Sequence, residues 1–422
     1  MRRCGMRGRA DETTTRVTIV RDPLWNNIPL DADAMRLVDT AVFQRLRYVR
    51  QLGLAFLVYP GATHSRFEHA LGTYHLTGRT LALLRERGEI AQLPADECAV
   101  VRAAALLHDV GHYPFSHALE EIGALHHEAV ARTLITGGEI ASVLASTIGK
   151  NAAMRAHAII TGESASPLQG LISGSLDLDK IEYLKRDALM CGVPYGEIDV
   201  ERLIHSLTIV EDPKSGAPAI GLVEKGLAAL ESLLFAKYQM YRNVYWHHAV
   251  RSATAMYKRL VDDAMRSGAI EEPELAGFTD EGLLHALEER APSMLLDALR
   301  NRRLHKRAFE LSATELEEGR GDWIAGDRTR VIEAEDALAR ELGVEPGAVL
   351  LDYPEKPRML GLDLPVRMRG GEVRRLGAKG LPAAINLPLL SQELYESTRV
   401  MRVFATEGTK VPKARVMELL AS

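Results

Sequence analysis

The sequence predicts a mainly α-helical protein with a smaller C-terminal α+β region. Helical patterns fill the first two thirds of the 422 residues, and strand-like segments begin only after about residue 340. Hydrophobic residues make up 46% of the chain, enough for a large core shared by two or three domains. We expect a disordered N-terminus over 1–15, a helical domain over 16–330 and an α+β region over 340–422.

The helices are predicted from apolar spacing and from residues that end helices. AVVRAAALLHDV, residues 99–110, is rich in Ala and Leu, and Gly111 and Pro114 should end or kink it. Residues 250–265 carry apolar side chains at helical spacing, which predicts a helix with one face on the core: Ala253, Met256, Tyr257, Leu260, Val261 and Ala264.

Three segments near the C-terminus have the composition of strands. They are GAVLLDYP at 347–354, LPVRMRGGEV at 364–373 and TRVMRVFA at 398–405. Gly370 and Gly371 form a turn signal within the second segment. These segments predict the sheet of the α+β region.

Overall charge and cysteine content exclude several classes of protein. The 52 basic and 57 acidic residues nearly balance, so the charge of the whole chain gives no support for binding nucleic acid or a membrane surface. Three separated cysteines form no CxxC pair, which fits a reducing cytoplasm. The basic start MRRCGMRGR is followed by no apolar segment, and no run of 18 apolar residues could span a bilayer. We therefore expect a cytoplasmic protein.

Histidines cluster in one part of the chain and indicate a site. Eight of the fourteen fall between residues 64 and 127: His64, His69, His75, His108, His112, His117, His126 and His127. His108 and Asp109 end an apolar helix, where a buried carboxylate is costly unless it is paired or bound to metal.

Two further segments could complete a metal site. RFEHALG at 66–72 places His69 near a helix start, and SLDLDKIEYLKRD at 175–187 offers Asp177 and Asp179 before a helix. Two His and two Asp make a mixed nitrogen and oxygen site, suited to Mn, Fe, Mg or Zn acting on a phosphoester. The residues do not choose among these metals.

At this point the chain resembles a known family. His69, His108–Asp109 and Asp179 are similar to the H…HD…D signature of the HD-domain metal-dependent phosphohydrolases. Five longer stretches resemble, in order and spacing, the branch of SAM-and-HD-domain deoxynucleoside triphosphate triphosphohydrolases: DTAVFQRLRYVRQLG (39–53), YPGATHSRFEHALG (59–72), LLHDVGHYPFSHALE (106–120), HHE (126–128) and DLDKIEYLKRD (177–187). The resemblance covers roughly residues 17–310 and leaves no room for a SAM domain.

The resemblance implies an all-helical HD core and roles for individual residues. His69, His108, Asp109 and Asp179 would hold a divalent metal ion, and Asp177 would not. The implied catalytic residues are His112, His117, His127 and Glu120. Glu120 stands where the family has an aspartate, so the same carboxylate has a longer reach. A neighbouring imidazole can donate a proton to the departing oxygen or position the attacking water.

The implied substrate residues divide between phosphates and sugar. Arg66, Lys180 and Lys237 match phosphate contacts, Lys237 with Lys in place of the family's Arg. Gln51, Tyr183, Asp187 and Tyr245 match the sugar edge, while Trp246 stands where the animal enzyme has a polar residue. Base and sugar selectivity can therefore differ from that of the animal enzyme.

The resemblance also implies regulation and assembly. Asp39, Gln44 and Arg47 match residues that read an activating guanine nucleotide between subunits, and Arg302 and Lys306 faintly match another part of that site. We expect a homo-oligomer, a tetramer or a dimer, with GTP or a dNTP as activator and with residues 340–422 in subunit contacts. The same FQRLR residues could instead serve only to pack a helix.

The implied reaction converts a dNTP and water into a deoxynucleoside and triphosphate. Other HD-domain reactions, on nucleoside monophosphates, cyclic dinucleotides or guanosine alarmones, are the alternatives among enzymes. A nucleotide-sensing regulator with an inactive HD site is the alternative from another class. The presence of all four metal ligands argues against the regulator.

Overall fold

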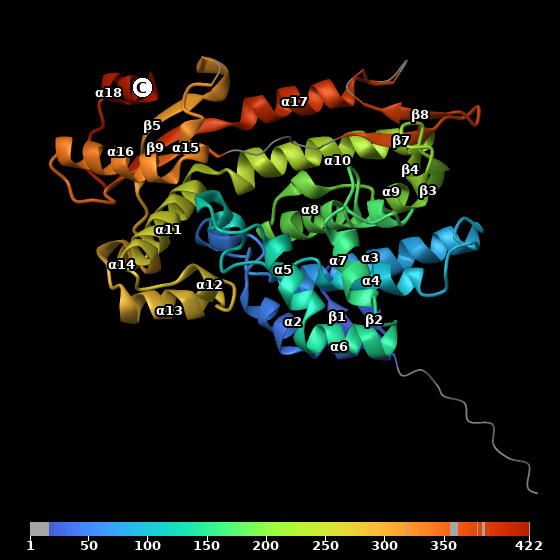
Figure 1. The fold of residues 1–422 in the computed structure, drawn as a ribbon. Helices are drawn as coiled ribbons and strands as arrows, with labels where there is room; N and C mark the ends of the chain where they lie inside the picture. Colours follow the sequence, from blue (N-terminus) through green and yellow to red (C-terminus); the bar gives the residue numbers. More distant parts are fainter. Residues whose placement is uncertain (1–16, 318, 355–361, 378, 382–384, 422) are drawn as a thin grey trace, which may run out of the picture.

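A computed structural model describes residues 17–317, 319–354, 362–377, 379–381 and 385–421. The disorder expected over 1–15 falls outside the described residues. Helices make up most of the fold, and the small sheets lie mainly among its C-terminal elements (Figure 1). Within the described part of the chain, no helix combines the length and the apolar content needed to cross a membrane.

The helices of the N-terminal two thirds form the main core. Their bounds are α1 (Ala32–Val38), α2 (Ala41–Arg45), α3 (Arg66–Glu86), α4 (Glu97–Leu107), α5 (His127–Thr136), α6 (Gly138–Thr147), α7 (Ala152–Ile160), α8 (Leu178–Cys191), α9 (Val200–Ser206), α10 (Leu227–Met240) and α11 (His248–Arg266). Helix α3 packs against both α4 and α8, and these three helices carry the predicted metal ligands or lie directly before them. The π-helix Tyr241–Tyr245 joins α10 to α11.

The remaining helices lie beyond α11. They are α12 (Glu272–Leu275), α13 (Asp280–Arg290), α14 (Met294–Arg300), α15 (Trp323–Gly326), α16 (Arg328–Glu341), α17 (Leu387–Thr398) and α18 (Lys413–Ala421). Helices α13 and α14 pack against α11, and α17 runs along α10 (Figure 1). The apolar face predicted over 250–265 is confirmed, because Ala253, Met256, Tyr257 and Leu260 are buried in one core cluster.

Three sheets complete the fold. Their strands are β1 (Thr18–Asp22), β2 (Asn26–Leu30), β3 (Leu207–Glu211), β4 (Pro218–Val223), β5 (Lys306–Ser312), β6 (Val349–Asp352), β7 (Leu364–Arg367), β8 (Val373–Leu376) and β9 (Val400–Ala405). β1 and β2 form a hairpin, the second sheet has the order β3-β4-β7-β8, and the third has the order β5-β9-β6.

The strand predictions near the C-terminus are confirmed, and others were missed. β6, β7 and β9 fall in the three predicted segments, β8 shares only Val373 with the second of them, and the Gly370–Gly371 turn lies between β7 and β8. The strands β1 to β5 lie in a region expected to be helical. Two of these missed strands pair with strands of the C-terminal region, β4 with β7 in parallel and β5 with β9 antiparallel. Their pairing partners are 88 or more residues away, which local patterning does not detect.

Caps fix the ends of the helices that carry the site. Ser65 and Glu68 form a capping box at the start of α3, which satisfies backbone N–H groups that the helix leaves open. Asp177 caps α8 by accepting from the Lys180 N–H at 2.9 Å. Helix α4 ends at Leu107, earlier than the residues 99–110 predicted, so His108 and Asp109 lie in the turn that follows it.

Candidate active site

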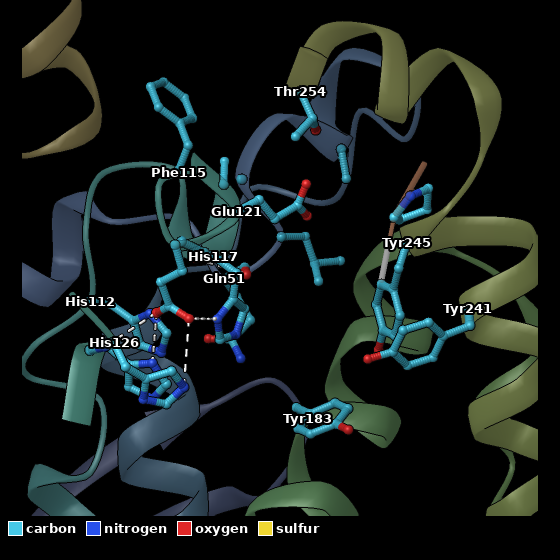
Figure 2. A pocket seen from close by; sticks show the side chains of 18 of the residues that line it. Gln51, His112, Phe115, His117, Glu121, His126, Tyr183, Tyr241, Tyr245 and Thr254 are labelled. Atoms are coloured by element: carbon cyan, nitrogen blue, oxygen red, sulfur yellow. Dashed lines mark hydrogen bonds and ion pairs between the residues drawn. The ribbon is translucent and has the colours of Figure 1, made fainter. Parts of the chain in front are cut away.

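A cavity of about 880 Å³ lies against the ends of the helices that carry the predicted residues. It is lined by all the predicted metal, catalytic and substrate residues except His69: Gln51, Arg66, His108, Asp109, His112, His117, Glu120, His127, Asp179, Lys180, Tyr183, Asp187, Lys237 and Tyr245. His69 is fully buried behind this lining. In Figure 2 the cavity-lining histidines, His112, His117 and His126 among them, lie on one side. The cavity-lining tyrosines lie on the other: Tyr183, Tyr241 and Tyr245.

The four predicted metal ligands converge on one point. The His69 and His108 Nε2 atoms lie 3.1 Å apart, and the Asp179 Oδ1 atom lies 2.9 Å from His69 Nε2 and 3.5 Å from His108 Nε2. Potential ligand atoms of His69, His108 and Asp109 all lie within 4.8 Å of one another. Two imidazoles and two carboxylates are a donor set for a divalent transition metal.

The hydrogen bonds of the two imidazoles fit a cation between them. His69 Nδ1 lies 2.6 Å from a Glu182 oxygen, and His108 Nδ1 lies 2.9 Å from the Ala105 carbonyl oxygen. Both Nδ1 atoms are therefore placed to donate, which directs the two Nε2 lone pairs at each other. Such an arrangement requires a positive charge at the Nε2 atoms.

The pKa of His69 also indicates that the cluster stabilises positive charge. Burial alone would lower it, but the hydrogen bonds to Asp179 and Glu182 raise the pKa of His69 to about 10. Burial would raise the pKa of Asp109, yet the neighbouring Arg66 and His108 hold it well below its ordinary value. The carboxylates therefore stabilise positive charge at this point, which a proton supplies on His69 and which a divalent cation bound to the neutral imidazoles would supply in its place.

Glu182 orients the cluster, and sequence reasoning missed it. Besides facing His69, it accepts from Trp25 Nε1 at 2.9 Å and from Arg186 Nε at 2.8 Å. Arg186 in turn donates to Asp22 at 3.0 Å. The signal in the sequence was the place of Glu182, one helical turn after Asp179, but Trp25 and Asp22 lie more than 150 residues away from it.

Asp177 and Asp179 lie in different surroundings. Asp177 accepts from the backbone N–H and the ammonium group of Lys180. Asp179, in the first turn of α8, faces His69 and His108. Because its oxygens already serve the helix cap, Asp177 is the poorer candidate ligand, as the resemblance implied.

The predicted catalytic residues form a second cluster beside the first. Glu120 Oε1 lies 2.8 Å from His127 Nδ1, and Glu120 Oε2 lies 3.3 Å from His117 Nδ1 (Figure 2). The rings of His112 and His127 stack with centroids 3.8 Å apart. Burial lowers the pKa of His127 to about 4 against the opposing bond to Glu120, and the two histidines hold the pKa of Glu120 well below its ordinary value despite burial.

The loop that carries these residues is held tightly. A Cβ atom at Gly111 would lie 2.0 Å from the His127 carbonyl oxygen, so only glycine lets the loop approach α5 this closely. Phe115 and Ser116 both have positive φ, at 57° and 65°, an uncommon conformation for side chains of their size. The backbone N–H of Phe115 donates to Asp280 at 2.7 Å, and this anchor was also missed from the sequence.

The three cations predicted to bind phosphates line the cavity, as do Arg251, Lys258 and Arg328. Arg66 donates to Asp109 at 2.6 Å and to Ser116 at 3.0 Å, which fixes its guanidinium beside the metal cluster. Lys180 donates to the Gly174 carbonyl oxygen at 3.0 Å and also pairs with Asp177. Lys237 is 2% exposed, with its ammonium 5.9 Å from the centre of the Tyr241 ring. These cations can bind an anion in the cavity.

The opposite end of the cavity holds hydroxyl and carboxylate groups. Asp187 accepts from the Tyr245 hydroxyl at 2.6 Å and faces the Nε2 atom of His64 at 2.8 Å. The Gln51 Oε1 atom is buried and has no hydrogen-bond partner within the described residues. Together with Tyr183, these residues can recognise a hydroxylated ring. His64 was not predicted to take part.

The residues predicted to bind an activator lie outside the cavity. Asp39 and Arg47 are exposed. Gln44 donates to the Val38 carbonyl oxygen at 2.8 Å and accepts from Arg47 Nε at 2.7 Å, while the Arg47 guanidinium covers the Phe67 ring. The packing role that the sequence left open is therefore observed, and the nucleotide role stays a prediction.

Comparisons with known proteins agree with this geometry. Residues 66–170 match the HD domain, and residues 198–381 match the HD associated region. The uncharacterized protein MJ1154 of Methanocaldococcus jannaschii is 33% identical over 343 residues, which are 81% of this chain and 70% of that protein. The chain belongs to the HD-domain phosphohydrolases. Within this superfamily it lies near the SAMHD1 branch.

Two further matches show how far the likeness extends. The deoxynucleoside triphosphate triphosphohydrolase SAMHD1 homolog of Dictyostelium discoideum is 27% identical over 69% of this chain and 60% of its own length. The crystal structure of a hypothetical protein from Aquifex aeolicus superimposes with a TM-score of 0.70 at 27% identity, covering 93% of this chain and 97% of that one. The chain spans 55% to 70% of the length of four curated relatives.

Proposed function

We propose that this HD-domain phosphohydrolase is a deoxynucleoside triphosphate triphosphohydrolase. It would convert a dNTP and water into a deoxynucleoside and inorganic triphosphate. The observation that carries this proposal is the composition of the cavity, whose lining combines metal-ligand residues, the cations Arg66, Lys180 and Lys237, and the pair of Asp187 and Tyr245. The SAMHD1 homolog of Dictyostelium supports the choice of substrate.

The metal cluster would hold the reacting phosphate. A divalent cation held by His69, His108, Asp109 and Asp179 would polarise a phosphoryl oxygen and supply a nucleophilic water, whether it is Mn, Fe, Mg or Zn. The α-phosphate would lie at this cluster, so that the bond between the α-phosphorus and the 5′-oxygen breaks. The electron pair of that bond leaves with the 5′-oxygen, which takes up one proton.

The cations and the histidines have separate tasks in this proposal. Arg66, Lys180 and Lys237 would neutralise charge that develops on the phosphates, within a cavity where such interactions exceed their strength in water. His117 and His127, oriented by Glu120, and His112, which stacks on His127, would handle the leaving-group proton. The triphosphate would raise the depressed pKa of His127 toward neutrality, because a nearby anion favours the protonated ring.

The sugar end would select the deoxynucleoside. Asp187 would accept from the 3′-hydroxyl, and Tyr183 would crowd the 2′ position against ribose. Gln51 carries a buried oxygen that needs a donor, which a sugar hydroxyl can supply. Asp39, Gln44 and Arg47 would bind GTP or a dNTP as activator between the subunits of a dimer or tetramer, with residues 340–422 contributing to assembly.

Product analysis tests the proposal. The full chain is reconstituted separately with Mn, Fe, Mg and Zn, incubated with the four dNTPs with and without GTP, and the products are separated by ion exchange. Deoxynucleoside and triphosphate in equal amounts are expected, with none from Asp109→Ala. A nucleoside monophosphate product would favour another HD-domain reaction. Binding without turnover under every metal would favour a nucleotide-sensing regulator.

A further inference from the structure

The cluster around Glu120 has the donors of a metal site of its own. His112, His117, Glu120 and His127 each offer a ligand atom, and these four atoms all lie within 4.8 Å of one another. The residues come from the turn after α4, from the following loop and from the first turn of α5. None of the four belongs to the set of His69, His108, Asp109 and Asp179.

The spacing of the donors is close to what a cation needs. Ligand atoms about 2.0–2.1 Å from a tetrahedral zinc ion lie roughly 3.3 Å from each other. One contact already has this spacing, Glu120 Oε2 to His117 Nδ1 at 3.3 Å, and Glu120 Oε1 lies closer to His127 Nδ1, at 2.8 Å. His126 Nε2 lies 3.6 Å from Glu120 Oε2, so a fifth donor stands beside the four.

A second observation points to a missing partner. The His112 ring is 1% exposed, and its Nδ1 atom has no hydrogen-bond partner in the described parts of the chain. A buried ring nitrogen without a partner costs free energy, which a ligand bound beside the ring can recover. The side chain of His117 is 58% exposed, so the cluster is buried at His112 and open to solvent at His117. An ion can therefore enter without unfolding the loop.

We propose that His112, His117, Glu120 and His127 form a second metal site, which takes a first-row transition metal such as zinc and whose occupation stops turnover. Three imidazoles and one carboxylate select Zn, Cu, Ni or Co over Mg and Ca, which prefer oxygen ligands. The inhibitory part rests on the proposed function: an ion on these nitrogen atoms occupies the groups that would transfer the leaving-group proton. The binding part stands independently of it.

Metal stoichiometry tests the site. The full chain and three variants are equilibrated with zinc by dialysis, and bound zinc per chain is measured by mass spectrometry, with circular dichroism to confirm folding. Two equivalents are expected for the unaltered chain, one for His117→Ala and one for Asp179→Asn. The control is His285→Ala, since His285 and Glu289 are an exposed His–Glu pair 3.4 Å apart on a helix. It should keep both equivalents.

The outcomes separate the alternatives. One equivalent in the unaltered chain, or two in His117→Ala, would overturn the second site. Loss of both equivalents in Asp179→Asn would mean one shared centre and would also overturn it. With the manganese form and a dNTP, turnover should fall as one equivalent of zinc binds while manganese is retained, and undiminished turnover would overturn the inhibitory role. If no dNTP is hydrolysed at all, the proposed function fails while the stoichiometry still decides the site.

Discussion

Gly72 offers the sharpest test of how the metal cluster is supported. On helix α3, a Cβ atom at Gly72 would lie 1.9 Å from Glu182 Oε1 and 2.8 Å from Arg186 Nη2. Both side chains are completely buried. In Gly72→Ala the Glu182 carboxylate must therefore move, and its hydrogen bonds to His69 and Trp25 are strained or lost.

The expected cost follows from these contacts. Overpacking of a buried site costs about 1–3 kcal/mol, and a hydrogen bond to a charged group contributes about 1.5–3 kcal/mol. Alanine recovers up to about 1 kcal/mol through its higher helix propensity. We expect the free energy of unfolding of Gly72→Ala to fall by about 2–4 kcal/mol. Its metal affinity should fall by about 10–100-fold, because His69 loses its orienting carboxylate.

Gly78 provides the matched control on the same helix. A Cβ atom there would meet no heavy atom within 4 Å among the described residues. Gly78→Ala should therefore raise the free energy of unfolding by up to about 1 kcal/mol and leave metal binding unchanged. Denaturant unfolding and competition with a chromogenic chelator measure both quantities. If Gly72→Ala and Gly78→Ala behave alike in both assays, the reasoning about Glu182 is refuted.

Three further predictions follow from buried groups. Glu182→Gln should weaken metal binding by about 10–100-fold in chelator competition, and unchanged affinity would exclude its orienting role. The pKa of His127 is lowered to about 4 from about 6.5 in the unfolded chain, so the folded state binds fewer protons between these values and loses stability on acidification. Unfolding at pH 7 and pH 5 should differ by about 2 kcal/mol more in the unaltered chain than in His127→Gln, and equal pH dependence would contradict this. Asp352→Asn leaves the buried Arg251 without its fully buried partner and should cost about 3–5 kcal/mol in denaturant unfolding, whereas Glu341→Gln, at an exposed pair, should change nothing measurable.

The sequence predicted those helices and strands whose formation depends on the spacing and composition of neighbouring residues. The amphipathic helix at 250–265, the Ala-rich helix before His108 and the strands near Leu350 and Val403 all follow from spacing and composition. Strand β5 could not be predicted in this way, because its one partner strand in the described sheet is β9, 88 or more residues further along the chain. Helix α4 ends at Leu107 with His108 as its C-cap, before Gly111 is reached.

The residues of the candidate site also divide into those that the sequence predicted and those that it did not. The candidate metal ligands and catalytic residues could be predicted from the sequence, because histidines and aspartates in these spacings resemble a family signature. The residues that hold these side chains in place could not be predicted from the sequence, because Trp25, His64 and Asp280 reach the site only through the tertiary fold. Gly111 illustrates the difference: its sequence position suggested a helix end, and the structure assigns it a close approach to His127.

The most direct test of the central claim is hydrolysis of a dNTP in ¹⁸O-labelled water by the metal-loaded chain, with Asp179→Asn as the control. Attack at the α-phosphorus predicts one labelled oxygen in each triphosphate, an unlabelled deoxynucleoside released in equal amount, and no products from Asp179→Asn. Label in the deoxynucleoside, release of a nucleoside monophosphate, or full activity of Asp179→Asn would contradict the account.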